Sequence, residues 1–98
     1  MLFAILFTDA LDHVAARQRE MPSHLRFLEK NSDRIRAAGP LRDGEDPSFS
    51  GGLWLVEAAD RAAVLALCRE DPFWPTGLRK SVRVCEWAQV FAEGRRQI

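Results

Sequence analysis

The sequence predicts an α+β domain in which the elements follow one another as strand, helix, strand, strand, helix and strand. Two observations support this class. Apolar runs of strand length alternate with segments whose apolar residues recur at helical spacing, and the helical segments carry start and stop residues at their ends. The chain has 98 residues. This length suits one domain, predicted to span residues 1–98, and leaves burial of its core incomplete.

The first strand is predicted at residues 2–7, where LFAILF is a continuous apolar run suited to burial on both faces. Residues 8–20 are polar and are predicted to form a loop with a short helical turn. The clearest helix is predicted from residue 21 to residue 38, with Pro22 in its first turn and with Gly39 and Pro40 at its end. Its apolar stripe consists of Leu25, Leu28, Ile35 and Ala38.

The second half repeats the pattern. Residues 40–52 open with a short edge strand and continue as a loop rich in Gly, Pro, Asp and Ser. A strand follows at 52–58, then a helix at 60–70 that Asp60 caps, and a long alternating strand at 78–91. This order predicts a ferredoxin-like sandwich, with two helices on one face of an antiparallel sheet. The other face has no cover within the chain, so we expect a homodimer.

Composition argues against nucleic acid or a membrane as the main partner, although a local basic patch is still possible. Lys+Arg and Asp+Glu are both 14, so the formal net charge is zero, and neither nucleic acid nor a membrane is an expected partner. The apolar opening segment is too short for a membrane span and lacks the features of a signal peptide. Cys68 and Cys85 have no CxxC spacing and are predicted to be buried free thiols. Because free thiols are usual in a reducing compartment, we expect a cytoplasmic protein.

Two residues are candidates for acid–base chemistry. The first is His24, because histidine exchanges its proton near neutral pH. Its imidazole could equally make only a structural hydrogen bond. Asp71 precedes Pro72 in DPFWPTG and could simply cap a short turn. Held by Pro72 and Pro75, it could also accept a hydrogen bond from one imidazole nitrogen and raise the basicity of the other. The two residues lie far apart in the sequence, and sequence alone does not show that they meet.

Other signals are weaker. His13 lies in a polar segment, and no neighbouring residue indicates a functional role for it. The stretch DPSFSGG precedes a strand and lacks the lysine of a P-loop, and no GxSxG is present. Ser48 and Ser50 suit ordinary turn chemistry. Two distant cysteines and two histidines lack zinc-ligand spacing. We therefore expect neither a cofactor nor a metal.

Several segments resemble the YCII-related domain family. The segment MPSHLRFLEKNSDRIRAAGPL is similar to that family's PxHLxxL and AGP segment, and EDPFWPTGL is similar to its DPxxxxG segment. The apolar first strand, the paired glycines before the third strand and a tryptophan in the last strand agree as well. The resemblance covers roughly residues 1–92.

The resemblance implies a ferredoxin-like subunit that dimerises as an α+β barrel. It also implies an enzymatic site built from the histidine of HL and the aspartate of DP, here His24 and Asp71. Arg17 stands where relatives often carry an arginine that could meet an anionic or enolate-like group, whereas Met21 replaces an arginine found in many relatives. At least one relative looks like an enzyme that removes chloride from a hydroxyquinol.

We therefore expect a small cofactor-independent enzyme in which His24 is the general acid/base and Asp71 orients it. The expected reaction is proton abstraction or elimination on a small organic molecule of phenolic or quinone-like type, hence a lyase-type, isomerase-type or dehalogenase-like activity. The alternatives are a non-catalytic module that binds a small metabolite, and a structural dimer subunit. The expected substrate contacts are Arg17, Ser50, Phe73 and Trp74.

Overall fold

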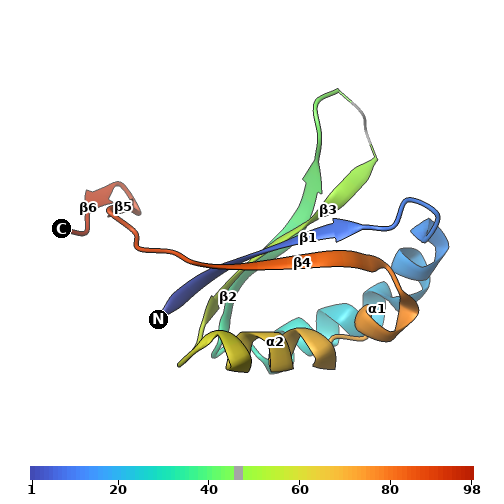
Figure 1. Ribbon diagram of the computed structural model, residues 1–98, viewed down its shortest axis with the longest axis horizontal. Coiled ribbons are helices and arrows are strands. Elements are labelled where there is room, and N and C mark those ends of the chain that lie inside the picture. The colour runs from blue at the N-terminus through green and yellow to red at the C-terminus, as the bar shows by residue number, and fades with distance from the viewer. Residues whose placement is uncertain (46–47) are drawn as a thin grey trace.

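The computed structural model describes residues 1–45 and 48–98, which form two layers (Figure 1). One layer is a four-stranded antiparallel sheet with the strand order β2-β3-β1-β4, and the other consists of two helices on one face of that sheet. The predicted α+β, ferredoxin-like class is confirmed. The elements are β1 (Leu2–Asp9), α1 (Val14–Lys30), β2 (Ile35–Arg42), β3 (Phe49–Glu57), α2 (Arg61–Glu70), the 3-10 turn η1 (Trp74–Thr76), β4 (Arg79–Glu86), β5 (Phe91–Ala92) and β6 (Arg95–Arg96).

The core lies between the sheet and the helices. Alternate residues of β1 point toward the helices, and the neighbouring strand β3 adds Trp54 and Val56 to the same face. Each large apolar side chain buried in this way contributes roughly 1.5–3 kcal/mol. The buried apolar cluster includes Phe3, Ile5, Phe7, Phe27, Trp54, Val56, Val64 and Leu67.

Helix α1 begins seven residues before the predicted start and ends eight residues before the predicted end. The prediction of a loop at 8–20 was therefore wrong from Val14 onward, and Pro22 lies inside the helix instead of in its first turn. The helix ends at Lys30, and the side-chain amide of the C-cap residue Asn31 donates to the Phe27 carbonyl at 2.8 Å. The polar run Asn-Ser-Asp that starts there is a turn signal, because short polar side chains compete for backbone groups.

Strand β2 occupies a segment that was predicted to be the end of the helix. Ile35 pairs with Val56 and Ala38 with Trp54, and the register shifts between them. This irregularity brings two residues three positions apart onto the helix-facing side of the sheet, where Ile35 is buried and Ala38 is exposed. In the sequence, this three-residue spacing is the same as that of residues on one face of a helix. The edge strand starts at Ile35 instead of at residue 40, Gly39 does not end a helix, and positions 46–47 of the predicted loop lie outside the described residues.

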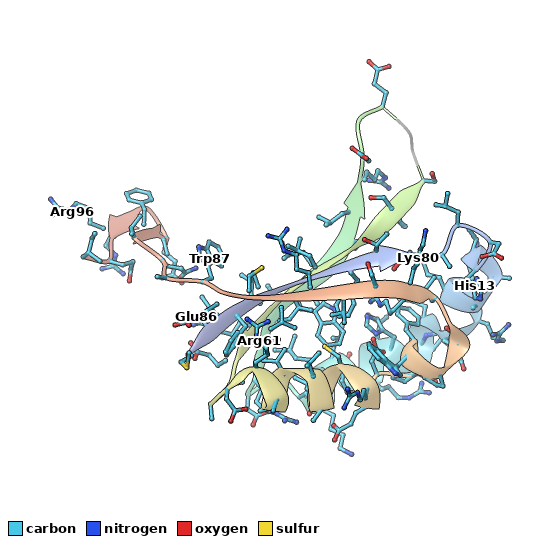
Figure 2. The ribbon with its side chains drawn as sticks, in the orientation of Figure 1. His13, Arg61, Lys80, Glu86, Trp87 and Arg96 are labelled. Atoms are coloured by element: carbon cyan, nitrogen blue, oxygen red, sulfur yellow. The ribbon has the colours of Figure 1, made fainter. Side chains whose placement is uncertain are left out.

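The last predicted strand is shorter than expected. It ends at Glu86, and the chain continues into a small hairpin of β5 and β6 around a turn at Glu93 and Gly94, which both have positive φ. Figure 1 shows this hairpin beyond the end of β4, away from the two layers. In Figure 2, Trp87 and Arg96 lie on this projecting segment.

The sheet face opposite the helices carries a patch of apolar residues. Leu6, Leu53 and Leu55 stand on it, and together with Ala4, Cys85 and Trp87 they line a shallow groove. Within residues 1–45 and 48–98, no element covers this face. The prediction of an open apolar face thus agrees with the arrangement of the layers.

Candidate active site

His24 and Asp71 are in direct contact. His24 lies near the middle of α1, not in its first turn as expected, and Asp71 is the residue that follows α2. His24 Nδ1 and Asp71 Oδ1 are 2.7 Å apart, and the two residues are only 7% and 2% exposed. Because a carboxylate can only accept, we assign the proton to Nδ1. Nε2 is then the basic nitrogen.

The turn after α2 holds the Asp71 carboxylate in place. Its Oδ1 also accepts the backbone N–H of Phe73 at 3.1 Å, and its carbonyl accepts the N–H of Trp74 at 2.8 Å. The turn ends at Gly77, whose φ of 82° favours glycine. Asp71 thus caps the turn, as the local sequence predicts, with the same oxygen that faces His24.

Aromatic rings support the His24 imidazole. The ring of Phe73 stacks on it with 4.1 Å between centroids and 14° between planes, and Trp54 lies 6.2 Å away. Phe73 is fully buried. It is therefore placed to fix the orientation of the imidazole.

A buried cluster of charges adjoins this pair. Asp9 accepts a hydrogen bond from Arg17 on one carboxylate oxygen and from Arg79 Nη1, at 3.0 Å, on the other. Arg79 Nη2 also lies 4.0 Å from Asp71 Oδ2. Burial lowers the pKa of the Arg79 guanidinium, while the nearby Asp9 carboxylate opposes that shift.

Sequence reasoning missed Asp9 and Arg79. They are paired residues at the ends of β1 and β4, which run antiparallel side by side. An aspartate at the end of the first strand and an arginine at the start of the last one therefore meet in a ferredoxin-like sheet. That pairing is the signal that could have identified them.

His24 forms part of the wall of a cavity of about 100 Å³. Arg17 and Arg79 line the same cavity, and Gly52 lies beside Arg79. A Cβ atom on Gly52 would be 3.2 Å from Arg79 Nη1, so the glycine leaves the guanidinium next to the open space. The other lining residues are Met21, Leu25, Leu28, Ala38, Gly39, Pro40 and Trp54.

A second cavity, of about 360 Å³, lies on another side of Arg17. Ser48 and Phe49 line it, and Phe49 is 5.3 Å below the Arg17 guanidinium. Arg17 therefore lies between the two cavities.

The structure brings some of the predicted site residues together and not others. Phe73 stacks on His24 without being among the described residues that line its cavity, whereas Arg17 lines that cavity. Among the described residues, neither Ser50 nor Trp74 lines the His24 cavity: Ser50 donates to the Leu41 carbonyl at 3.3 Å, and Trp74 packs against the core. His13 pairs with Asp12 at 2.7 Å on the surface.

Cys68 and Cys85 are free thiols, and burial raises the pKa of Cys68 to about 12. In the part of the chain that the structure describes, no three His, Cys, Asp or Glu residues form a group able to hold a metal ion. The described helices include none with the length and apolar character to cross a membrane.

Comparisons with known proteins identify a matching family and a similar solved structure. The YCII-related domain matches residues 1–88. A solved structure of 5-chloro-2-hydroxyhydroquinone dehydrochlorinase from Burkholderia phenoliruptrix AC1100, in complex with 2,5-dihydroxybenzoquinone, is similar with a TM-score of 0.80 and 26% sequence identity, over 90% of this chain and 94% of that chain. No curated protein sequence matches. From the match over most of its length, the chain belongs to the family of YCII-related domains.

Proposed function

We propose that this protein is a cofactor-independent enzyme that performs acid–base chemistry on a small phenolic or quinone-like molecule. His24 is the general acid/base, and Asp71 orients it. The observation that carries the proposal is the buried 2.7 Å contact between His24 Nδ1 and Asp71 Oδ1 at the wall of a cavity. The similar dehydrochlorinase, which acts on a chlorinated hydroxyhydroquinone, supports this substrate class.

The chemistry follows from the tautomer. With Nδ1–H donated to Asp71, the lone pair of His24 Nε2 takes a proton from an acidic O–H or C–H group, and the carboxylate stabilises the imidazolium that forms. In an elimination, the C–Cl bond then breaks and chloride leaves with the electron pair. Loss of HCl converts a chlorinated hydroxyhydroquinone into a hydroxyquinone, so the step needs no external oxidant.

The remaining predicted substrate contacts take different parts in this proposal. Arg17 reaches the cavity and binds an oxygen of the substrate, since a guanidinium suits an oxyanion. Phe73 acts through the His24 ring on which it stacks. Ser50 and Trp74 remain predictions as substrate contacts, although among the described residues neither lines the His24 cavity or the larger cavity beside Arg17.

The decisive experiment measures chloride release and quinone absorbance under anaerobic conditions, with 5-chloro-2-hydroxyhydroquinone and related chlorinated hydroquinones. We expect His24→Gln to lower turnover by about 10²–10⁴-fold, the usual contribution of a general acid/base. His13→Gln is the matched control, because His13 makes an imidazole–carboxylate contact of equal length on the surface. Turnover that survives in His24→Gln contradicts the acid–base role.

The same measurements separate the alternative function. A binding or regulatory module would bind 2,5-dihydroxybenzoquinone saturably, and no compound of the series would lose chloride. The buried imidazole–carboxylate pair would then serve only to shape the cavity.

The proposal includes a homodimer formed through the open sheet face. The apolar side chains of that face, among them Leu6 and Leu55, and the exposed Phe91 of the projecting hairpin support it. Sedimentation should give twice the 11.1 kDa of one chain. Leu55→Asp should give the single mass, whereas Ala66→Asp, on the exposed side of α2, should not. A wild-type chain that sediments as a monomer refutes the dimer.

A cytoplasmic location is also part of the proposal. Both cysteines, Cys68 and Cys85, are free thiols, as is usual in a reducing compartment. Fractionation of cells that produce the protein tests it, and recovery from an oxidising compartment would contradict it.

A further inference from the structure

Arg79 has hydrogen-bond donors that no described residue uses. Its side chain is only 4% exposed. Nη1 donates to Asp9, but Nη2 lies 4.0 Å from the Asp71 carboxylate, too far for a hydrogen bond, and Nε has no partner within residues 1–45 and 48–98. Since buried donors are nearly always paired, a buried arginine beside a cavity calls for an explanation when two of its nitrogens, Nε and Nη2, make no hydrogen bond.

The position of the Arg79 guanidinium is tightly set. The Arg79 Cζ atom lies 4.2 Å from the Phe7 ring centroid and 5.2 Å from the Phe73 ring centroid. Asp9 accepts hydrogen bonds from both Arg79 and Arg17. It lines the His24 cavity next to Gly52, where a side chain would crowd it. Such a fixed fork of donors recognises a planar oxyanion at little entropic cost.

The charges around the cavity favour a ligand that becomes anionic there. Arg17 and Arg79 contribute two positive charges, and Asp9 and Asp71 two negative ones, so the cluster is balanced while His24 is neutral. A proton that passes from substrate to His24 adds one positive charge. The oxyanion left on the substrate restores the balance, and Arg79 has unused donors to offer it.

We propose that Arg79 is a specificity-determining residue of the His24 cavity. Its Nη2 binds the oxyanion of an acidic enol or phenol. This inference rests on the proposed function for the identity of the site. Neutral analogues of the same shape are rejected, because an amino group in place of the oxyanion leaves the guanidinium without an acceptor.

Two planar ligands of nearly equal size test this selection by calorimetry. 2,5-Dihydroxybenzoquinone is a vinylogous acid and is ionised at neutral pH, whereas 2,5-diaminobenzoquinone is neutral and carries N–H donors in place of the oxyanions. The wild-type protein should bind the dihydroxy compound at least about tenfold more tightly. Arg79→Met should weaken that binding by about 10–100-fold and change binding of the diamino compound less than threefold. Arg19→Met, an exposed arginine of α1, is the matched control and should change neither.

Three results overturn the inference: wild-type protein that binds neither compound, wild-type protein that binds both equally, or Arg79→Met that keeps the preference. If Arg79→Met does not fold, Arg79→Lys decides, because it keeps the charge and loses the planar fork. An unchanged preference in Arg79→Lys then refutes the assignment. Turnover that survives in His24→Gln, with the binding preference intact, would instead refute the proposed function alone.

Discussion

Replacing Asp71 should destabilise the protein strongly, although it is one carboxylate in a loop. In Asp71→Asn the amide oxygen can keep both hydrogen bonds that Oδ1 accepts, from His24 Nδ1 and from the Phe73 N–H, so the variant removes mainly the charge. That charge lies 4.0 Å from Arg79 Nη2. At an effective dielectric constant of about 20, this separation corresponds to roughly 4 kcal/mol of attraction.

The net loss of stability is smaller than this attraction, because Asp71→Asn also removes the cost of desolvating the buried carboxylate. Removing one partner of a buried ion pair typically costs about 3–5 kcal/mol, and we expect about 3 kcal/mol for Asp71→Asn. Asp71→Ala also leaves two donors unpaired and should cost about 5 kcal/mol, at about 1 kcal/mol for each lost hydrogen bond. Such losses are a large part of the stability of a small domain.

Urea unfolding, followed by tryptophan fluorescence at one fixed protein concentration, measures the free energy of unfolding. Asp12→Asn is the control, because Asp12 makes a contact of the same 2.7 Å length with His13 on the surface, where solvent screens it. The order of stability should be wild type equal to Asp12→Asn, then Asp71→Asn, then Asp71→Ala. Equal midpoints for Asp71→Asn and Asp12→Asn would refute the reasoning from the buried charge.

Three further predictions concern the neighbourhood of the site. Gly51→Ala should lower the urea midpoint sharply, because its Cβ would lie 1.8 Å from the Phe7 carbonyl oxygen in the adjacent strand; an unchanged midpoint would show that the strands can separate freely. Gly52→Ala should weaken binding of 2,5-dihydroxybenzoquinone in calorimetry by about tenfold or more, since its Cβ crowds Arg79 at 3.2 Å, and unaltered affinity would place the ligand elsewhere. The Cys68 thiol keeps its proton to about pH 12 when folded, whereas the unfolded chain releases it near 9.0. The free energy of unfolding should therefore fall with rising pH across that window, by up to about 1.4 kcal/mol per pH unit, and Cys68→Ala should lack this component in the same urea titrations; identical slopes would count against the shift.

Local patterns in the sequence predict much of the fold. The continuous apolar run of β1, the alternation at the start of β4 and the Asp60 cap of α2 are all decided by neighbours in the chain. Asp60 indeed accepts the backbone N–H of Ala63 at 2.8 Å. Likewise, the turn after α2 depends on Asp71 and the prolines around it. The predicted cap is the hydrogen bond that Asp71 Oδ1 accepts from the backbone N–H of Phe73, two residues later.

Helix α1 and strand β2 show where local patterns fail. Pro22 suggested a helix start, yet the helix continues through it, and the three-residue spacing of Ile35 and Ala38 suggested a helix where a bulged strand pairs with β3. Pairing with β3 makes this segment a strand, because Ile35 pairs with Val56 and Ala38 with Trp54 in the ladder. Ile35 is buried there, whereas Ala38 is exposed.

Patterns along the chain are enough to predict the class of the fold and the order of its main elements, and to single out His24 and Asp71 as candidates for a pair. The contact between their side chains, the cavity beside them and the link from Arg17 through Asp9 to Arg79 follow from the folded structure alone. The difference lies in separation along the chain. Caps and periodicity depend on residues a few positions apart, whereas a buried site depends on burial and pairing between strands and helices that only the folded sheet brings together.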